Sequence, residues 1–347
     1  MNPTDSSQPK MQPQSQSKRL LSLGTDRLLF EEGSSVRDRI LGYARDWDEI
    51  HIIVSADKNF TETAIGNNVW IYPTRSKVKA FYPLHMRNLG RFIIKRRNIT
   101  NITCQDPFLT AIAGVGLKKE FGLPLEIQVH TDIGSPNYPR TVGNKIRKAL
   151  ALSYLPKADS IRVVSGRVKK YLVEGLAISE SKITVRPIAV DVEKIKNTPV
   201  TVDLRKKYPQ FDKIILMASR LTEEKNIGLA LRALPAVLRL CPKAGLVIVG
   251  RGPKETELKK LTQKLGLAES VVFEDWIDPA TLVSYYKTSD LFLNTSLFEG
   301  YGMTLVEAKA AGCMIVSTDV GVARDIGTRI IPDDSDGAAS VICDMLK

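Results

Sequence analysis

Two glutamates flank a pair of glycines in the segment Phe298–Glu307, which reads FEGYGMTLVE. Glu299 is expected to end a loop after a strand, and Glu307 to lie about one and a half turns into the next helix. Gly300 and Gly302 leave the backbone N–H groups at the start of that helix open to an anion, which the helix dipole also attracts. Because carboxylates accept hydrogen bonds from sugar hydroxyls, this segment predicts a site for a sugar diphosphate.

Two other loops of the second half carry residues suited to phosphate. Arg220 and Lys225 lie on a loop that leads into a helix, where two cations would neutralise a diphosphate, although a solvated loop fits the same residues equally well. Gly250 and Gly252 resemble the start of a dinucleotide fingerprint, but Glu255 takes the place of the third glycine. A NAD site is therefore disfavoured, and a tight turn with close backbone approach is favoured.

The elements that position these loops alternate between short β-branched runs and amphipathic stretches, which predicts parallel α/β sheets. In the first half we expect strands at residues 19–24, 49–55, 69–72, 102–104, 125–130, 160–165 and 183–186, with helices at 107–121, 142–155 and 166–174. In the second half we expect strands at 213–220, 245–249, 271–273, 291–294 and 314–317, with helices at 227–240, 253–265, 279–287 and 302–311.

The 347 residues suggest two globular domains. We expect a disordered leader at residues 1–18, an N-terminal Rossmann-like domain at 19–195 and a C-terminal Rossmann-like domain at 196–347, with the linker near residues 188–204. Ligands of open parallel sheets bind beyond the carboxyl ends of the strands. A cleft between two such domains is therefore the expected active site.

Composition argues against several other classes of protein. The longest apolar runs, residues 150–155 and 214–218, fall far short of the ~18 residues that a membrane-spanning helix needs. The four cysteines show no C-x-x-C spacing and no neighbouring histidine cluster, so we expect reduced thiols and no zinc site. Asp334-Ser335-Asp336 has the D-x-D pattern of some metal–diphosphate sites, but its turn-rich context favours a loop and helix cap. We predict no metal ion.

Taken together, these motifs resemble glycosyltransferase family 4, whose members have the GT-B fold and transfer sugars from nucleotide donors with retention. Phe298–Glu307 matches the E-x7-E motif of that family. The other segments that carry the resemblance are Ala218–Arg220, Glu224–Asn226, Val249–Pro253, Asp275–Trp276, Ser289–Asp290, Gly312, Gln105–Phe108, Gln128–Asp132, Ala158–Ser160, Val164–Ser165, Lys182–Ile183 and Val190–Asp191. The resemblance covers roughly residues 19–332 and implies an α/β GT-B fold with two Rossmann-like domains facing each other across a cleft, the first for the acceptor and the second for the donor.

The resemblance also implies a role for each matching residue. Arg220 and Lys225 would bind the donor diphosphate and stabilise it as a leaving group, and Glu307 would bind the ribose. Glu299 would hold hydroxyls of the transferred sugar. The residues that would assist through their backbone, or line the nucleotide, are Gly33, Gly250, Gly252, Trp276, Ile277, Gly300, Tyr301, Gly302, Met303 and Thr304. His130 matches the family histidine near the reaction centre.

No protein nucleophile and no cofactor are expected, because the nucleotide sugar is itself a substrate. Gly33 is the best match to a glycine-rich loop that family members carry after the first strand. After residue 337 only one short helix, residues 338–346, is expected, where the family normally continues with further helices.

The net charge of +12 belongs to the first half of the chain. Residues 1–190 hold 29 Lys and Arg against 17 Asp and Glu, whereas residues 191–347 hold 21 of each. Residues 75–97 contain eight cations interleaved with apolar side chains and no acid. Such a basic amphipathic helix can lie on an anionic membrane, each cation contributing roughly 1 kcal/mol. A solvated helix face is the alternative, and nucleic acid is disfavoured because no binding motif accompanies the charge.

The sequence therefore predicts a retaining glycosyltransferase of the hexosyltransferase type, cytoplasmic or peripheral at the inner face of the membrane. Its acceptor would be a hydroxyl of a growing glycan or of a lipid-linked sugar. Two alternatives stay open: another GT-B enzyme, such as a phosphorylase or a nucleotide-sugar epimerase, and a sugar-nucleotide-binding protein without catalytic activity.

Overall fold

The computed structural model describes residues 17–347. By their internal contacts these residues form two compact units. The first unit holds the residues up to Gln128 together with Lys157–Asp159, and the second unit holds Val129–Pro156 and Ser160–Lys347. Most of the leader predicted at residues 1–18 lies outside the described residues, and the domain boundary predicted between residues 195 and 196 stays a prediction.

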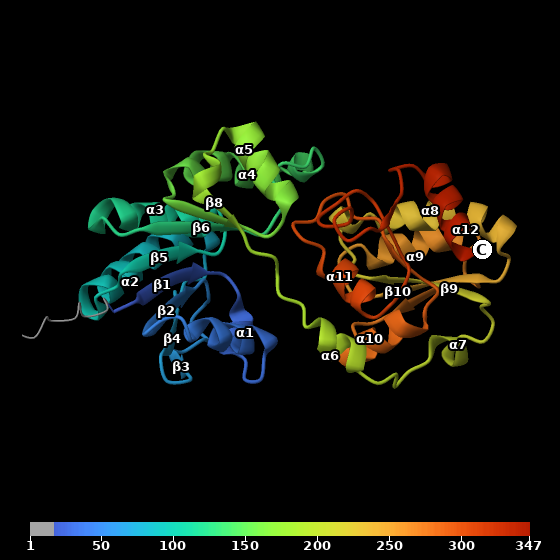
Figure 1. The fold of residues 1–347 in the computed structure, drawn as a ribbon, viewed down its shortest axis with the longest axis horizontal. Coiled ribbons are helices and arrows are strands. Elements are labelled where there is room, and N and C mark those ends of the chain that lie inside the picture. The colour runs from blue at the N-terminus through green and yellow to red at the C-terminus, as the bar shows by residue number, and fades with distance from the viewer. Residues whose placement is uncertain (1–16) are drawn as a thin grey trace, which may run out of the picture. The chain divides into compact units, whose positions relative to one another are not determined.

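Eight strands form a mostly parallel sheet in the order β3-β4-β2-β1-β5-β6-β7-β8 (Figure 1). β1 pairs in parallel with β2 and β5, whereas β3 pairs with β4 in the antiparallel sense. The strands are β1 (Arg19–Gly24), β2 (Glu49–Val54), β3 (Thr63–Ile65), β4 (Val69–Pro73), β5 (Asn101–Cys104), β6 (Leu125–Val129), β7 (Ser160–Val163) and β8 (Ile183–Val185). The helices of this part are α1 (Ser35–Ala44), α2 (Tyr82–Arg97), α3 (Leu109–Phe121), α4 (Val142–Tyr154) and α5 (Gly166–Leu176).

Six strands form a second sheet in the order β11-β10-β9-β12-β13-β14, and each of its pairs is parallel. The strands are β9 (Lys213–Ala218), β10 (Ala244–Val249), β11 (Val271–Glu274), β12 (Leu291–Asn294), β13 (Ile315–Ser317) and β14 (Arg329–Ile330). The helices are α6 (Val192–Asn197), α7 (Leu204–Lys207), α8 (Ile227–Leu240), α9 (Glu255–Lys264), α10 (Pro279–Thr288), α11 (Met303–Ala310) and α12 (Ser335–Leu346).

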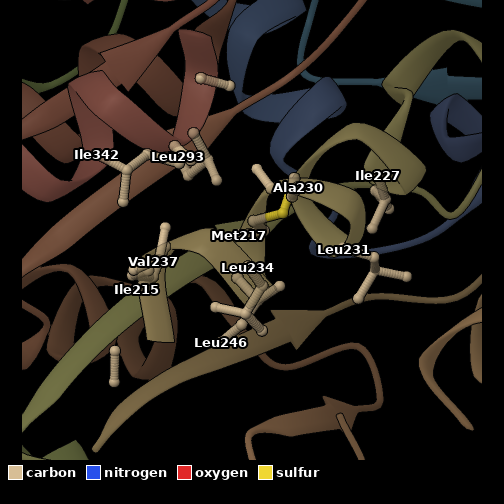
Figure 2. Close-up of a cluster of buried hydrophobic side chains, with 14 of the residues drawn as sticks. Ile215, Met217, Ile227, Ala230, Leu231, Leu234, Val237, Leu246, Leu293 and Ile342 are labelled. Carbon is tan, nitrogen blue, oxygen red and sulfur yellow. The ribbon is translucent and has the colours of Figure 1, made fainter. Parts of the chain in front are cut away.

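Both faces of the second sheet are covered by apolar side chains. Leu234 and Val237 of α8 pack with Met217 of β9 and Ile342 of α12 in one cluster (Figure 2). Tyr286 and other side chains form a second cluster, which contains the residues of β9 that alternate with those of the first. A strand buried on both faces reads as a continuous apolar run, so β9 was recognisable from its sequence.

The alternating strands and helices expected from the sequence are present, and most ends agree within two residues. Five labelled elements of the described residues were not named among those expected: α1, β3, α6, α7 and β14. β3 has only three residues, too few for a period-two pattern, and α6 and α7 fall in or next to the stretch predicted to be a linker without periodicity. Asp191 and Asp203 begin these two helices by accepting backbone N–H bonds, as N-cap residues do. Within residues 17–347, no helix combines the length and apolarity needed to cross a bilayer.

Candidate functional site

The start of α11 is an open helix end built by glycines. β12 leads into a loop that ends at Gly302, whose φ of +91° is a conformation that glycine adopts without strain. No side chain caps this end of α11, so the first amide groups of the helix are left for a ligand. At Gly300 a Cβ would lie 1.9 Å from the carbonyl oxygen of His130. That position must therefore be glycine for the loop to pack against residue 130.

Glu299 lies on this loop and forms an ion pair with Lys225. The Lys225 Nζ donates to Glu299 Oε1 at 2.5 Å, and the Ser296 hydroxyl donates to the same oxygen at 2.7 Å. The Lys225 and Glu299 side chains are only 16% and 17% exposed. In this arrangement the cation expected to bind phosphate is neutralised by the carboxylate expected to bind sugar.

The loop that carries Lys225 is fixed to the Glu299 loop by backbone contacts. The Thr295 hydroxyl donates to the carbonyl oxygens of Lys225 and Asn226, both at 3.0 Å. The Leu297 amide donates to the carbonyl of Glu224 at 2.8 Å. These bonds join segments about seventy residues apart in the chain and hold the Lys225 backbone beside residue 299.

Arg220 lies on the same loop but has a different partner. Its guanidinium donates to Glu224 at 3.1 Å, and its side chain is 74% exposed. Arg220 is therefore a surface cation near the site, held by a weak pair. The structure brings Lys225 and Glu299 together and leaves Arg220 outside that contact.

Glu307 occupies the partly buried side of α11. Burial raises the pKa of its carboxyl above the usual range, although a hydrogen bond from the Tyr286 hydroxyl, at 3.4 Å, acts in the opposite direction. Burial likewise raises the pKa of Tyr286, which lies in the core. Sequence reasoning missed Tyr286, and nothing in the local sequence of α10 distinguishes it from an ordinary core residue.

Gly250 and Gly252 serve the close approach of two loops. A Cβ at Gly250 would lie 2.0 Å from the carbonyl oxygen of Ser219, and one at Gly252 would lie 2.3 Å from that of Leu221. The Leu221 amide donates to the carbonyl of Arg251 at 2.9 Å. The space that these glycines leave is filled by the neighbouring backbone, as the close-approach interpretation predicts.

Trp276 and Ile277 follow β11. Trp276 is 69% exposed, whereas Ile277 is partly buried against the apolar cluster around Tyr286. Just before them, Asp275 receives two hydrogen bonds from Arg251 at 2.7 Å, and this guanidinium lowers the pKa of Asp275. An exposed indole beside a fixed loop is a surface on which a nucleobase can stack.

Residues that follow β6 and β7 contact the same loop. The Ser165 hydroxyl donates to the carbonyl of Gly300 at 2.9 Å, and the Tyr138 ring packs edge-on against Phe298 at 5.3 Å between centroids. Asp132 is buried, which raises its pKa, and it accepts the amides of two residues that follow it. Val164–Ser165 belongs to the family resemblance and Tyr138 carries no motif, but the sequence does not show that either contacts this loop.

Two further positions were singled out in the sequence. Gly33, at φ +72°, belongs to the first unit, so its place in the donor site stays a prediction. Asp334 accepts the Gly337 amide at 2.8 Å as the N-cap of α12, which confirms the interpretation of the D-x-D segment as a helix cap.

Comparison with known families assigns the chain. Residues 34–194 match the family model described as Glycosyltransferase Family 4, and residues 203–329 match the model described as Glycosyl transferases group 1. The chain belongs to glycosyltransferase family 4. The resemblance seen in its motifs is confirmed.

Two relatives illustrate the similarity in sequence. The chain is 28% identical over 233 residues to the alpha-monoglucosyldiacylglycerol synthase of Streptococcus pneumoniae, a match that covers 65% of this chain and 53% of the relative. It is 33% identical over 148 residues to the phosphatidyl-myo-inositol mannosyltransferase of Mycolicibacterium smegmatis, covering 40% of this chain and 38% of that one. The matches thus span about half or less of the length of these curated relatives.

Solved structures confirm the GT-B fold. Sucrose-phosphate synthase from Thermosynechococcus elongatus superposes with a TM-score of 0.78 at 17% identity, over 95% of this chain and 90% of that one. Anabaena HepE in complex with UDP and glucose superposes with a TM-score of 0.71 at 16% identity, again over 95% and 90%. At such identities the likeness concerns the fold alone.

Proposed function

We propose that this protein transfers a hexose from a nucleoside-diphosphate sugar to a hydroxyl group, with retention of the anomeric configuration. The observation that carries the proposal is the Lys225–Glu299 ion pair beside the open end of α11. A cation, a carboxylate and uncapped amides converge there. This is the set of groups that a phosphate joined to a sugar requires.

The donor is expected to bind in three parts. Lys225 and the first amides of α11 receive the diphosphate, and Arg220 reaches it from its exposed position on the same loop. Glu307 accepts hydrogen bonds from the ribose, and Trp276 supports the base. Glu299, released from Lys225 by the arriving phosphate, then accepts hydroxyls of the sugar.

The transfer step breaks the bond between the anomeric carbon and the β-phosphate oxygen. The acceptor oxygen forms its new bond to the same carbon from the same face, and its proton passes to the departing phosphate. Lys225, Arg220 and the α11 amides stabilise the negative charge that develops on the leaving group. His130, whose carbonyl packs on Gly300, is expected to contact the sugar beside this bond.

The names of the relatives point to a lipid acceptor. One is a glucosyldiacylglycerol synthase and another a phosphatidylinositol mannosyltransferase. We therefore favour a hydroxyl of a lipid-linked acceptor, or of a glycan built on one, and association with an anionic membrane surface.

α2 offers one surface for such association. Phe81, Leu84 and Phe92 are 53%, 54% and 48% exposed, while Met86 and Ile93 of the same segment are buried. Not all of its cations are free to meet lipid, because Arg91 donates to Glu120 at 2.6 Å and holds the pKa of that carboxyl at about 2. The exposed rings and the cations at the end of the helix are the part that fits a membrane.

α4 offers a further surface that the sequence reasoning did not single out. Val142 and Ile146 are 74% and 57% exposed on one face of the helix. Residues 133–158 contain no acid and five cations, so the charge around this apolar face suits an anionic interface.

Membrane association is tested by sedimentation with vesicles of phosphatidylcholine, with and without phosphatidylglycerol. The parent protein should sediment with the anionic vesicles and less so at high salt. Phe81→Ser with Leu84→Ser should reduce binding, and so should Val142→Ser with Ile146→Ser. Leu240→Ser removes an exposed apolar residue on α8, with an exposed fraction of 68%, and should change nothing. If neither double substitution reduced vesicle binding, these two surfaces would not be the membrane contact.

Transfer is tested with a panel of UDP-, GDP- and ADP-sugars, with and without a lipid-linked acceptor. Lys225→Ala and Glu307→Ala should abolish transfer without loss of the fold, as judged by circular dichroism. Lys259→Ala, which removes an exposed lysine paired with Glu255 on α9, is the matched control. Full activity in both site variants would refute the proposal. Release of sugar phosphate, or of an isomerised nucleotide sugar, would instead indicate a phosphorylase or an epimerase.

A further inference from the structure

A polar pocket of about 390 Å³ lies within the second unit beside Leu297, two residues before Glu299. Its lining comes from three places. The loop before α4 provides Arg140, the first turns of α8 provide Asn226 and Arg232, and the loop before α12 provides Asp333 and Asp334. The residues given a role in donor binding do not line it, so the proposed transfer leaves this pocket without a ligand.

Two arginines that line this pocket, Arg140 and Arg232, are in no ion pair within the part of the chain that the structure describes. Among residues 17–347, neither Arg140 nor Arg232 has an ion pair or a side-chain hydrogen bond. Other arginines of this unit do find partners: Arg205 pairs with Asp290 at 2.7 Å. Two unpaired cations that converge on one concave surface from different elements raise the local potential for an anion.

The position of Arg232 adds to this argument. A Cβ at Gly228 would lie 3.0 Å from the Arg232 Nη1, so the guanidinium lies over the first turn of its own helix. That end of α8 carries the positive end of the dipole, where a cation is unfavourable and an anion favourable. An anion in the pocket would reduce this repulsion, and a side chain at 228 would crowd the guanidinium in this position.

The two aspartates of the pocket have donors other than these arginines. Asp334 accepts the Gly337 amide at 2.8 Å and caps α12, where the helix dipole stabilises its charge. Asp333 accepts a hydrogen bond from the Asn226 side chain at 3.2 Å. Both carboxylates therefore already have donors, whereas the guanidinium groups lack acceptors.

We infer that this pocket binds a phosphate group of the acceptor, as a monoester or a diester, between Arg140 and Arg232. Guanidinium groups bind phosphate oxygens through paired N–H donors, which is the chemistry that two facing arginines supply. Naming the ligand as the acceptor rests on the proposed function; the binding of phosphate does not. The contact between the Asn137 side chain and the Leu297 carbonyl, at 3.4 Å, joins the Arg140 loop to the loop of Glu299.

The binding test uses the full chain without donor, titrated calorimetrically with inorganic phosphate and with glycerol 3-phosphate at low salt. Arg140→Gln and Arg232→Gln should each weaken binding by about tenfold or more, the loss expected for one charge-assisted contact. Arg239→Gln removes an exposed arginine from the far end of α8 and should leave binding unchanged. The inference would be overturned if all three variants bound phosphate with the same affinity, or if Arg239→Gln lost as much affinity as the other two.

Two further variants separate this pocket from the donor site and from simple misfolding. Phosphate bound at the donor site would be lost in Lys225→Ala, whereas phosphate in this pocket should survive that change. Gly228→Ala should displace the Arg232 guanidinium and weaken phosphate binding while leaving the melting temperature equal or higher, because alanine favours the helix. If phosphate binding disappeared in Lys225→Ala and persisted in Gly228→Ala, phosphate would not bind in this pocket and the inference would be refuted.

The source of the phosphate is distinguished by a second pair of ligands. Tighter binding of glycerol 3-phosphate identifies a free phosphorylated acceptor, and tighter binding of glycerophosphoglycerol identifies a lipid headgroup. If neither ligand binds, the inference is overturned. If phosphate binds as expected but no nucleotide sugar is turned over, the proposed function is wrong and the phosphate pocket stands. If transfer proceeds but the arginine variants bind phosphate like the parent, the phosphate pocket is wrong and the proposed function stands.

Discussion

Replacement of Glu299 by glutamine tests the central feature of the site. The Oε1 atom of Glu299 accepts from Lys225 at 2.5 Å and from Ser296 at 2.7 Å. Glutamine has the same shape and keeps an oxygen for both donors, but it carries no charge. The perturbation therefore removes the electrostatic part of the pair and leaves the geometry intact.

The magnitude follows from the exposure of the pair. With both side chains less than one-fifth exposed, the pair is neither a surface contact nor fully buried. A hydrogen bond to a charged group contributes about 1.5–3 kcal/mol and a neutral one about 0.5–1.5 kcal/mol. Glu299→Gln should therefore lower the free energy of unfolding by about 1–2 kcal/mol, measured by urea denaturation at neutral pH.

Ligand affinity should change in the opposite direction. A diphosphate that binds Lys225 must first break its contact with Glu299, so this carboxylate competes with the ligand. Removing that competition should tighten the binding of a nucleoside diphosphate without sugar, by up to about tenfold for each 1.4 kcal/mol released. Transfer should fall in the same variant, because Glu299 is also expected to hold the sugar.

Calorimetric titration with UDP and GDP provides the assay, and Ser296→Ala provides the control. This control loses the 2.7 Å bond to Glu299 but leaves the charge, so it should reduce stability without a gain in affinity. Unchanged or weaker binding of both nucleotides by Glu299→Gln would show that Glu299 does not compete with the diphosphate for Lys225, and would refute this prediction.

Three other changes test packing and protonation. Gly300→Ala should destabilise the protein by about 1–3 kcal/mol or more, because its Cβ would lie 1.9 Å from the His130 carbonyl oxygen. Gly143→Ala is the control, since no atom lies nearer than 4.0 Å to its Cβ, and the melting temperatures of the two variants test the difference. Leu234→Ala, in the core of Figure 2, should cost about 2–5 kcal/mol in urea denaturation, and a loss below this range would show that the cluster collapses around the gap. Burial of His51 lowers its pKa below 6.5, so the folded state binds fewer protons than the unfolded chain, and stability should fall as the pH drops through that value. His51→Gln should flatten this dependence, and an unchanged slope would assign it to other groups.

Much of the fold could be predicted because its signals are local. β9 is apolar on both faces, and the glycines at 300 and 302 indicate by their spacing alone where α11 begins. The E-x7-E motif likewise places Glu299 and Glu307 on one loop and helix. Local sequence cannot show that Lys225, 74 residues earlier, neutralises Glu299, nor that the Tyr286 hydroxyl contacts Glu307. Those contacts depend on which strands are neighbours in the sheet.

On the surface, too, the sequence predicts local patterns but not tertiary contacts. The sequence of α2 presents cations among apolar residues, but only packing decides that Met86 is buried and Leu84 exposed. The cations at 87 and 91 read as free charges in the sequence, yet both donate to Glu120, which comes from α3. Side-chain partners across helices are set by tertiary contact and leave no periodic signal.

The balance of charge in residues 191–347 has a consequence for the proposed selectivity. Residues 191–347 carry no net charge, and the cations of the site loops are each paired: Lys225 with Glu299, Arg220 with Glu224 and Arg251 with Asp275. Free phosphate can replace Glu299 as the partner of Lys225, but it leaves that carboxylate without its cation in a partly buried position, with the Ser296 hydroxyl as its remaining donor, which is costly. A sugar diphosphate replaces both partners at once, because its phosphate meets Lys225 and its hydroxyls meet Glu299. The pair would thus favour the intact donor over the product diphosphate, and Glu299→Gln should reduce that preference.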